Sequence, residues 1–134
     1  MHFLLVDDSK VSLKILKKQI LSIQESNIYC VDNGEKAVES YKRLHKKSEG
    51  SIIILMDINM PIVNGIEATK KIRHYENANN IEPNKRCKII VTTDYEDERA
   101  KFLAQMVGAN SFINKPISSK KIKDELIKFE CIPA

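Results

Sequence analysis

Two short apolar runs end in acidic residues, and this pattern constrains the fold more than any other feature of the chain. Ile52–Met56 is followed by Asp57, and Phe3–Val6 is followed by Asp7 and Asp8. Apolar runs of this length are typical of strands buried on both faces of a parallel sheet. Ligands of open α/β sheets bind at the carboxyl ends of the strands, so the three carboxylates are expected to meet there. Their repulsion requires a shared proton or a cation, and a hard divalent cation with oxygen ligands is the natural partner.

Strand-like and helix-like segments alternate along the whole chain. Strands are predicted over residues 2–6, 28–31, 52–56, 88–92 and 111–114. Helices are predicted after Ser9, from the Asp32-Asn33-Gly34 cluster to about Lys46, after Gly65 to about Tyr75, over Glu96–Val107, and after Ser118 or Ser119. The polar stretch Asn77–Arg86 is expected to be a loop. Five β/α units predict a parallel sheet with helices on both faces, and the absence of linkers and repeats predicts one domain over residues 1–134.

The overall composition is that of an ordinary globular domain. The chain has 134 residues, of which 43% are hydrophobic and 30% charged, and its formal net charge is +4. Its lysine pairs are spread over separate predicted helices, which indicates solvated helix faces rather than a nucleic-acid-binding stripe. No stretch has the apolar length of a membrane helix, and Asp7 and Asp8 interrupt the first apolar run too early for a signal peptide. We therefore expect a cytoplasmic protein that contacts neither a membrane nor nucleic acid directly.

The cysteines predict no metal site. Cys30, Cys87 and Cys131 are odd in number and lack metal-ligand spacing, so they are expected to be free thiols in a reducing compartment. Cys30 and Cys87 lie in or beside predicted strands. Both are therefore expected to pack as inert residues in the core or at strand ends.

Polar side chains follow four of the five predicted strands. They are Asp7 and Asp8 after the first strand, Asp57 after the third, Thr92, Thr93 and Asp94 at the fourth, and Lys115 after the fifth. Carboxylates, a hydroxyl and an ammonium around one point suit phosphoryl transfer. A bound cation and the lysine neutralise phosphate oxygens, and the hydroxyl donates a hydrogen bond. An aspartate can itself be the nucleophile and form an acyl phosphate.

The strand-end residues belong to a set of short motifs. These are Val6-Asp7-Asp8-Ser9, Met56-Asp57-Ile58-Asn59-Met60-Pro61, Asn64-Gly65, Ile89-Ile90-Val91-Thr92-Thr93, Phe112 and Lys115-Pro116. In this order and spacing they resemble the receiver domain of two-component response regulators over essentially the whole chain. The resemblance implies a flavodoxin-like (βα)5 doubly wound sandwich with a five-stranded parallel sheet of order 2-1-3-4-5. It also implies a protein that takes a phosphoryl group from a phosphohistidine donor and acts as a conformational switch or phosphorelay intermediate.

The resemblance assigns Asp57 as the phosphoacceptor. It implies that Asp8 and Asp57 hold Mg²⁺ directly, together with the backbone carbonyl of Asn59. Asp7 would act mostly through bound water. Gly65 is expected to let the loop after Asp57 pass close to the site and start the next helix.

The resemblance also gives Thr93, Lys115 and Phe112 roles in a switch. Thr93 would move to meet the phosphoryl oxygen, Lys115 would pair with Asp57 and then with the phosphate, and Phe112 would change rotamer when Thr93 moves. Thr92 competes with Thr93 as the hydroxyl, but strand alternation turns only one of them toward the crevice, and the family spacing to Lys115 favours Thr93. Phe112 is equally compatible with a plain core position. The peptide bond between Lys115 and its following proline would be cis.

Asp94 departs from the family pattern, in which the residue after the switch hydroxyl is usually small. We expect its acidic side chain to slow phosphoryl entry from small donors or to alter hydrolysis. Asn59 and Tyr95 fall where the family tunes hydrolysis of the acyl phosphate. The Asn77–Arg86 loop resembles that of receivers attached to hybrid histidine kinases.

Two other functions fit these residues less well. An aspartate-nucleophile phosphatase typically needs a second Asp two residues after the nucleophile, and here that position is Asn59. A flavodoxin-like cofactor binder would need a hydroxyl- and glycine-rich phosphate cradle in the first loop, which carries carboxylates instead. We therefore expect a module that promotes its own phosphorylation and dephosphorylation, not an enzyme acting on external substrates. A stand-alone receiver, a relay intermediate and a piece of a hybrid histidine kinase all stay open.

Two helices offer candidate partner contacts. The expected buried stripe of the first helix is Ile15, Leu16, Ile20 and Ile23. Val11 and Leu13 lie at its edges near Asp8, where an exposed patch would suit a histidine kinase or histidine phosphotransfer domain, and half-buried packing is the alternative. The family usually carries its output surface on the fourth helix, fifth strand and fifth helix, so a downstream protein is expected there. Phe102 and Met106 form either an exposed ridge or core contacts on that fourth helix.

Overall fold

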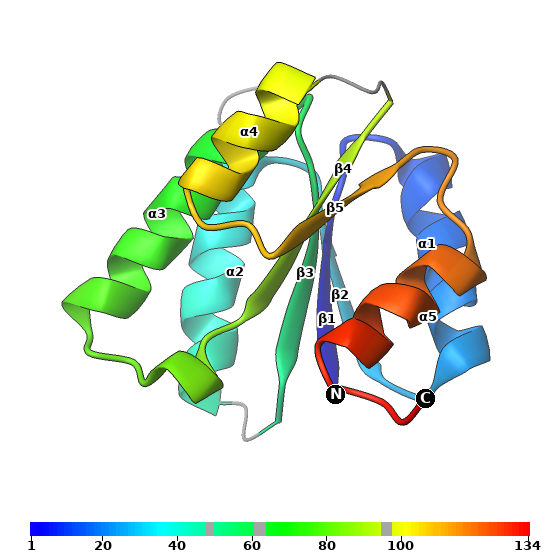
Figure 1. Cartoon of the computed structure of the whole chain (residues 1–134), viewed down its shortest axis with the longest axis horizontal. Helices are drawn as coiled ribbons and strands as arrows, with labels where there is room; N and C mark the ends of the chain where they lie inside the picture. Colours follow the sequence, from blue (N-terminus) through cyan, green and yellow to red (C-terminus); the bar gives the residue numbers. More distant parts are fainter. Residues whose placement is uncertain (48–49, 61–63, 95–97) are drawn as a thin grey trace.

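Five parallel strands form one sheet in the part of the chain that the computed structural model describes, which is residues 1–47, 50–60, 64–94 and 98–134. The strands are β1 (His2–Val6), β2 (Asn27–Val31), β3 (Ile52–Asp57), β4 (Lys88–Thr93) and β5 (Ser111–Asn114). The helices are α1 (Lys10–Ile23), α2 (Gly34–Lys47), α3 (Gly65–Ala78), α4 (Glu98–Met106) and α5 (Ser119–Lys128). The strand order is β2-β1-β3-β4-β5 (Figure 1), so the predicted flavodoxin-like (βα)5 fold is confirmed.

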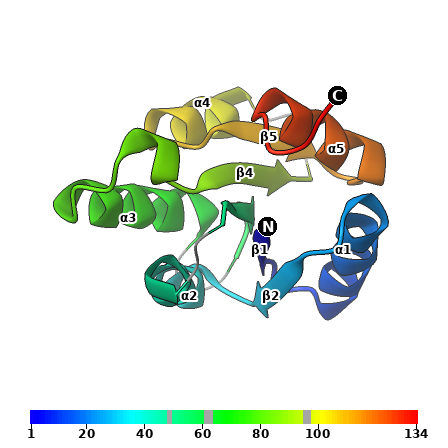
Figure 2. The same ribbon diagram turned by 90° about the horizontal axis from the view of Figure 1, so that it is seen from below.

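The helices cover both faces of the sheet and create two cores. α1 and α5 lie on one face, and α2, α3 and α4 lie on the other (Figures 1 and 2). One core contains Leu16, Ile20, Ile122 and Leu126 of the two-helix face and alternate strand residues such as Leu5 and Leu55. The other contains Tyr41, Ile72 and Ala104 of the three-helix face and strand residues such as Leu4 and Ile54. Because both faces are covered, every residue of β3 is buried, which explains the continuous apolar run that precedes Asp57.

The strands reach further than the apolar runs alone predict. β3 and β4 each extend one residue beyond prediction, to Asp57 and Thr93, because these residues still pair with the neighbouring strand. α3 ends at Ala78, whereas the sequence predicted its end near Tyr75. A short 3₁₀ helix, Pro83–Lys85, lies inside the stretch predicted to be a loop.

Side-chain caps mark the start of four of the described helices. The side chains of Ser9, Asn33, Asn64 and Ser118 accept hydrogen bonds from the N–H groups of Ser12, Lys36, Glu67 and Lys121, respectively. Ser118, not Ser119, is therefore the cap of α5. The predicted start of α4 at Glu96 lies outside the described residues. Among the described residues, no helix has the length and apolar character needed to cross a membrane.

Two predicted burials are wrong. Ile15 is 51% exposed, because it lies about 100° around α1 from the buried Leu16 and so falls outside the core-facing stripe. Cys30 is exposed, because β2 is an edge strand. Cys87 is buried as predicted, and burial raises the pKa of its thiol, which keeps it protonated and inert. All three cysteines are free.

A buried polar network ties α2 and α3 to the edge of the sheet opposite Asp57. Glu76 of α3 has no exposed surface. Its carboxylate accepts hydrogen bonds from the Tyr41 hydroxyl at 2.8 Å and the Cys87 N–H at 2.9 Å, and it pairs with Arg73 at 2.6 Å. Arg73 also donates to the backbone carbonyls of Cys87 and Gly108. Each buried charge in the network therefore has a partner, which is the condition for such a group to be tolerated.

We expect Glu76→Ala to lower the free energy of unfolding by about 3–5 kcal/mol, because it leaves the Arg73 charge and the Tyr41 hydroxyl without their buried partner. Urea unfolding followed by circular dichroism measures the change. Glu39→Ala, at an exposed position of α2, is the matched control and should change stability by less than about 0.5 kcal/mol. A loss for Glu76→Ala as small as that of the control would contradict a stabilising role for the network.

Candidate functional site

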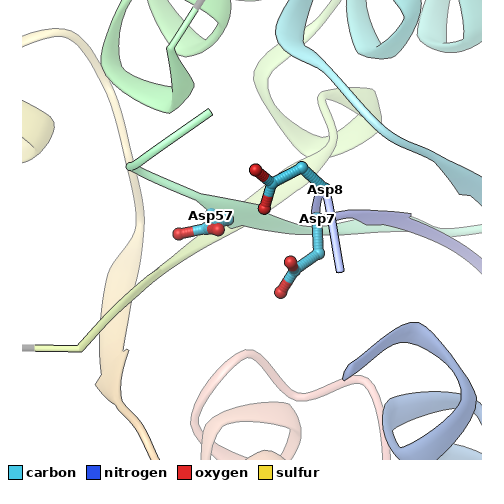
Figure 3. Close-up of side chains that lie close together, drawn as sticks. All are labelled: Asp7, Asp8 and Asp57. Carbon is cyan, nitrogen blue, oxygen red and sulfur yellow. The ribbon is translucent and has the colours of Figure 1, made fainter. Parts of the chain in front are cut away.

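The carboxyl ends of β1 and β3 bring three aspartates together (Figure 3). Val6 pairs with Met56, so Asp7, Asp8 and Asp57 follow or end neighbouring parallel strands at nearly the same level. One carboxylate oxygen from each aspartate lies within 4.8 Å of the others. Asp7 and Asp57 are only 2% and 3% exposed, whereas Asp8 is exposed. The cluster predicted from the strand ends is therefore present.

Backbone N–H groups orient the two buried carboxylates. Asp7 Oδ1 accepts the N–H of Ser9 at 2.9 Å, and Asp57 Oδ1 accepts the N–H of Asn59 at 3.2 Å. The start of α3 lies close to the end of β3, where the Gly65 N–H donates to the Ile58 carbonyl at 3.1 Å. A Cβ atom at Gly65 would overlap the backbone carbonyl of Asp57, so the close approach predicted here requires a glycine.

Lys115 follows β5 and reaches the same cluster. Its Nζ lies 3.3 Å from Asp7 Oδ2 and 3.6 Å from Asp57 Oδ2. Its backbone N–H donates to the carbonyl of Thr93 at 2.7 Å, which holds Lys115 against the end of β4. The peptide bond to Pro116 is cis, as predicted.

Burial and charge repulsion decide the protonation of the site. Burial raises the pKa of Asp57 to about 6, against the attraction of Lys115 and the hydrogen bond from Asn59, and repulsion by Asp7 and Asp8 adds to the increase. Burial opposes the charge of Lys115, but the Asp57 and Asp7 carboxylates outweigh it and raise the Lys115 pKa. Three carboxylates facing one ammonium leave excess negative charge on oxygen ligands. This donor set fits a hard divalent cation such as Mg²⁺.

The two threonines at the end of β4 are both buried, on opposite faces of the sheet. Alternation places Thr93 on the face of Val91, toward the core beneath α2, α3 and α4, and turns Thr92 toward α1 and α5. Phe112 of β5 pairs with Val91 and is partly buried against that same core. Thr93 and Phe112 therefore share one face of adjacent strands, which the switch roles require. Those roles stay predictions.

Lys101 of α4 is a neighbour of Phe112 that sequence reasoning missed. Its Nζ lies 5.4 Å from the centre of the Phe112 ring and 3.8 Å from Glu98 Oε1. The Lys101 side chain is only 14% exposed. The i,i+3 spacing from Glu98 predicts an ion pair along the helix, but no local pattern links α4 to Phe112.

Of the residues expected to tune the acyl phosphate, the structure describes Asn59 and Asp94. Both are exposed, Asn59 two residues after Asp57 and Asp94 directly after β4. Tyr95 lies outside the described residues. Their effects on hydrolysis and on phosphoryl entry stay predictions.

Comparison with known proteins identifies the family. Residues 3–127 match the response regulator receiver domain, so the chain belongs to this family. It is 34% identical to the chemotaxis protein CheY of Thermotoga maritima, over 93% of each chain. A chain of the co-crystal of the Saccharomyces cerevisiae phosphotransfer protein Ypd1 with the Ssk1 receiver domain matches with a TM-score of 0.82 and 26% identity, covering 98% of this chain and 89% of that one. A chain of the CheX–CheY–beryllofluoride–magnesium complex of Borrelia burgdorferi matches with a TM-score of 0.82 and 25% identity, covering 97% and 89%.

Similar domains also occur within much longer proteins. The chain spans only 10% of the osmosensing histidine kinase SLN1 of Saccharomyces cerevisiae and 6% of a hybrid histidine kinase of Dictyostelium discoideum. The family and these relatives define its class of function. The chain is a receiver domain with a phosphoacceptor role in two-component signalling.

We expect Asp57→Asn to raise the free energy of unfolding by about 1–3 kcal/mol at pH 7.5 without divalent cations. The charged carboxylate is disfavoured in the folded protein, because its pKa there is about 6 and its ordinary value is 3.8. This energetic penalty is complete above the folded pKa and disappears as the pH falls toward the unfolded pKa. The stability gained by Asp57→Asn should therefore shrink between pH 6 and pH 4. Urea unfolding at several pH values measures this difference in the free energy of unfolding.

Asp32→Asn is the matched control for this measurement. Asp32 follows β2 at the same edge of the sheet, and its side chain is 58% exposed. The control should show no comparable gain at pH 7.5. An Asp57→Asn gain of equal size at pH 4.5 and pH 7.5 would mean that its origin is not the buried charge.

Proposed function

We propose that Asp57 is the phosphoacceptor of this receiver domain. The observation that carries the proposal is the position of its carboxylate, which is buried at the end of the central strand β3 with Lys115 Nζ 3.6 Å away. The raised pKa of about 6 also makes Asp57 more basic, and so more nucleophilic, than an ordinary aspartate. The Asp7 carboxylate, by comparison, accepts the Ser9 N–H and lies closer to Lys115 Nζ. This position suits a metal ligand better than a phosphoacceptor.

The proposed reaction is an in-line transfer from phosphohistidine. An Asp57 oxygen bonds to phosphorus, the P–N bond breaks, and the imidazole leaves with the electron pair and takes up a proton. Lys115 and the Thr93 hydroxyl would stabilise the phosphoryl oxygens. Mg²⁺, held directly by Asp8, Asp57 and the Asn59 backbone carbonyl and by Asp7 mostly through bound water, would supply further positive charge to those oxygens.

The same residues favour a switch over an enzyme acting on external substrates. Asn59 cannot exchange a proton as the general acid/base of a phosphatase would. We infer that the domain promotes only its own phosphorylation and dephosphorylation. Thr93 and Phe112 share one face of the sheet, and Lys101 joins the Phe112 ring to α4. A movement of Thr93 toward the phosphoryl group would therefore reach α4 through Phe112.

Exposed apolar residues on α1 are the proposed donor surface. Val11 and Ile15 are 68% and 51% exposed and lie one helical turn apart. A groove of about 180 Å³ is lined in part by Ile15, Lys115 and Pro116. Leu13 packs instead against the core. We propose that a helical phosphohistidine domain docks here, and the Ypd1 co-crystal supports a phosphotransfer protein as the class of partner.

The face formed by α4, β5 and α5 is the proposed contact for a downstream protein. Phe102, Leu103 and Met106 are all exposed on α4, so these side chains form a ridge and not a core contact. Large apolar side chains gathered on one exposed helix are typical of protein interaction sites. The ridge lies on the same helix as Lys101, which contacts Phe112.

Phosphotransfer from a radiolabelled phosphohistidine domain in the presence of Mg²⁺ tests the assignment. The wild-type protein should be labelled, and Asp57→Asn should lose the label, because an amide cannot form the acyl phosphate. Asp32→Asn, which removes an exposed carboxylate at the same edge of the sheet, should be labelled normally. Labelling of Asp57→Asn at the wild-type level would overturn the proposal.

Beryllofluoride, which mimics the phosphoryl group, tests the output face on the same proteins. Its addition with Mg²⁺ should change amide hydrogen exchange over Glu98–Met106 in the wild type and not in Asp57→Asn. Unchanged exchange in α4 of a protein that has bound beryllofluoride would remove this face as the output surface.

Val11→Gln with Ile15→Gln tests the donor surface without adding charge. We expect the phosphotransfer rate from a phosphohistidine protein to fall about tenfold or more, because two exposed apolar contacts are replaced by polar groups. Acetyl phosphate should phosphorylate the variant at the wild-type rate, since it needs no docking surface and the charge near the site is unchanged. Leu21→Gln, at an exposed apolar position near the other end of α1, is the control. An equal loss in both variants, or with both donors, would exclude docking at this patch.

A further inference from the structure

Asp94 places a fourth carboxylate beside the site. It is exposed directly after Thr93, at the carboxyl end of β4. The Thr93 carbonyl accepts the N–H of Lys115 at 2.7 Å, so Asp94 and Lys115 are held at the ends of adjacent strands. The charge of Asp94 therefore lies beside the strand end that carries Lys115, the lysine 3.6 Å from Asp57.

Asp94 also decides the net charge that an incoming donor meets. The three clustered aspartates and Lys115 together carry a net charge of −2, which a bound divalent cation would cancel. Asp94 then adds one excess negative charge on the exposed side of the site. Small phosphoryl donors are anions, and a local charge of the same sign lowers their concentration at the site and their rate of entry.

We propose that Asp94 selects phosphoryl donors by charge, slowing transfer from small diffusible acyl phosphates while sparing transfer from a docked phosphohistidine protein. This inference rests on the proposed role of Asp57. A protein donor is held by contacts along α1, away from Asp94, whereas a small anion has only the local field to guide it. Asp94 is thus a specificity-determining residue that takes no part in bond making.

Two small donors of different charge separate this effect from a steric one. With acetyl phosphate, an Asp57 oxygen bonds to phosphorus, the P–O bond to the acetyl group breaks, and acetate leaves with the electron pair. With phosphoramidate, the same bond forms, the P–N bond breaks, and ammonia leaves. Phosphoramidate carries the lower net negative charge of the two, so a charge effect must be smaller for it.

Asp94→Asn removes the charge at nearly constant size. We expect the rate with acetyl phosphate to rise about threefold to fivefold at low ionic strength and to approach the wild-type rate at about 0.5 M salt, because a unit charge acting across several ångströms of water is screened. The rate with a phosphohistidine protein should change by less than about twofold. Rapid quench followed by intact-mass spectrometry measures each rate. Asp94→Glu should behave as wild type.

Asp124→Asn is the matched control, because it removes the same charge from an exposed position on α5. Binding of beryllofluoride with Mg²⁺, followed by NMR titration, is a second readout that needs no turnover, and Asp94→Asn should bind this anion more tightly at low salt. Unchanged rates, or equal increases with both small donors at every ionic strength, would overturn selection by charge. Loss of the phosphoacceptor assignment would appear separately, as labelling of Asp57→Asn.

Discussion

Burial of negative charge at neighbouring strand ends is the constraint on which the site depends. Asp7 and Asp57 are buried together, and Lys115 offsets only part of their charge. Burial is the main reason that the pKa of Asp57 rises to about 6, and repulsion by Asp7 and Asp8 adds to the increase. A bound cation and a transferred phosphoryl group would both act on this residual charge, so the same property that makes the clustered carboxylates unfavourable would make the site responsive.

The sheet holds this unfavourable arrangement because its strands are parallel and their carboxyl ends lie level with one another. Asp57 ends β3, the central strand, whose residues are buried on both faces. Lys115 is fixed to β4 through the Thr93 carbonyl, and Gly65 allows the loop after β3 to pass against Asp57. The polar groups are therefore positioned by strand register and by backbone contacts, while the helices supply the apolar surface that keeps the sheet together.

Local patterns were sufficient to predict the strands and the acidic cluster, because buried apolar runs and the polar residues that end them are adjacent in the sequence. The exposure of Ile15 was not predictable in the same way, because the sequence does not show how wide the buried stripe of α1 is, and Ile15 lies about 100° around the helix from the buried Leu16. The exposure of Cys30 follows from strand order, which places β2 at the edge. The contact of Lys101 with Phe112 joins two separate elements and depends on their packing, and no local spacing encodes it.

The remaining polar interactions explain how an unfavourable site and a stable domain coexist. The network around Glu76 lies at the amino edge of the sheet, next to the starts of β4 and β5, and the aspartates lie at the carboxyl edge. Arg73 binds the Gly108 carbonyl just beyond the end of α4, so this helix is held at the end far from the site. Its other end follows the segment after β4, and Lys101 rests on Phe112 between the two ends. The proposed switch would therefore displace the near end of α4 while the far end stays anchored, and stability need not be lost for a signal to reach the exposed ridge.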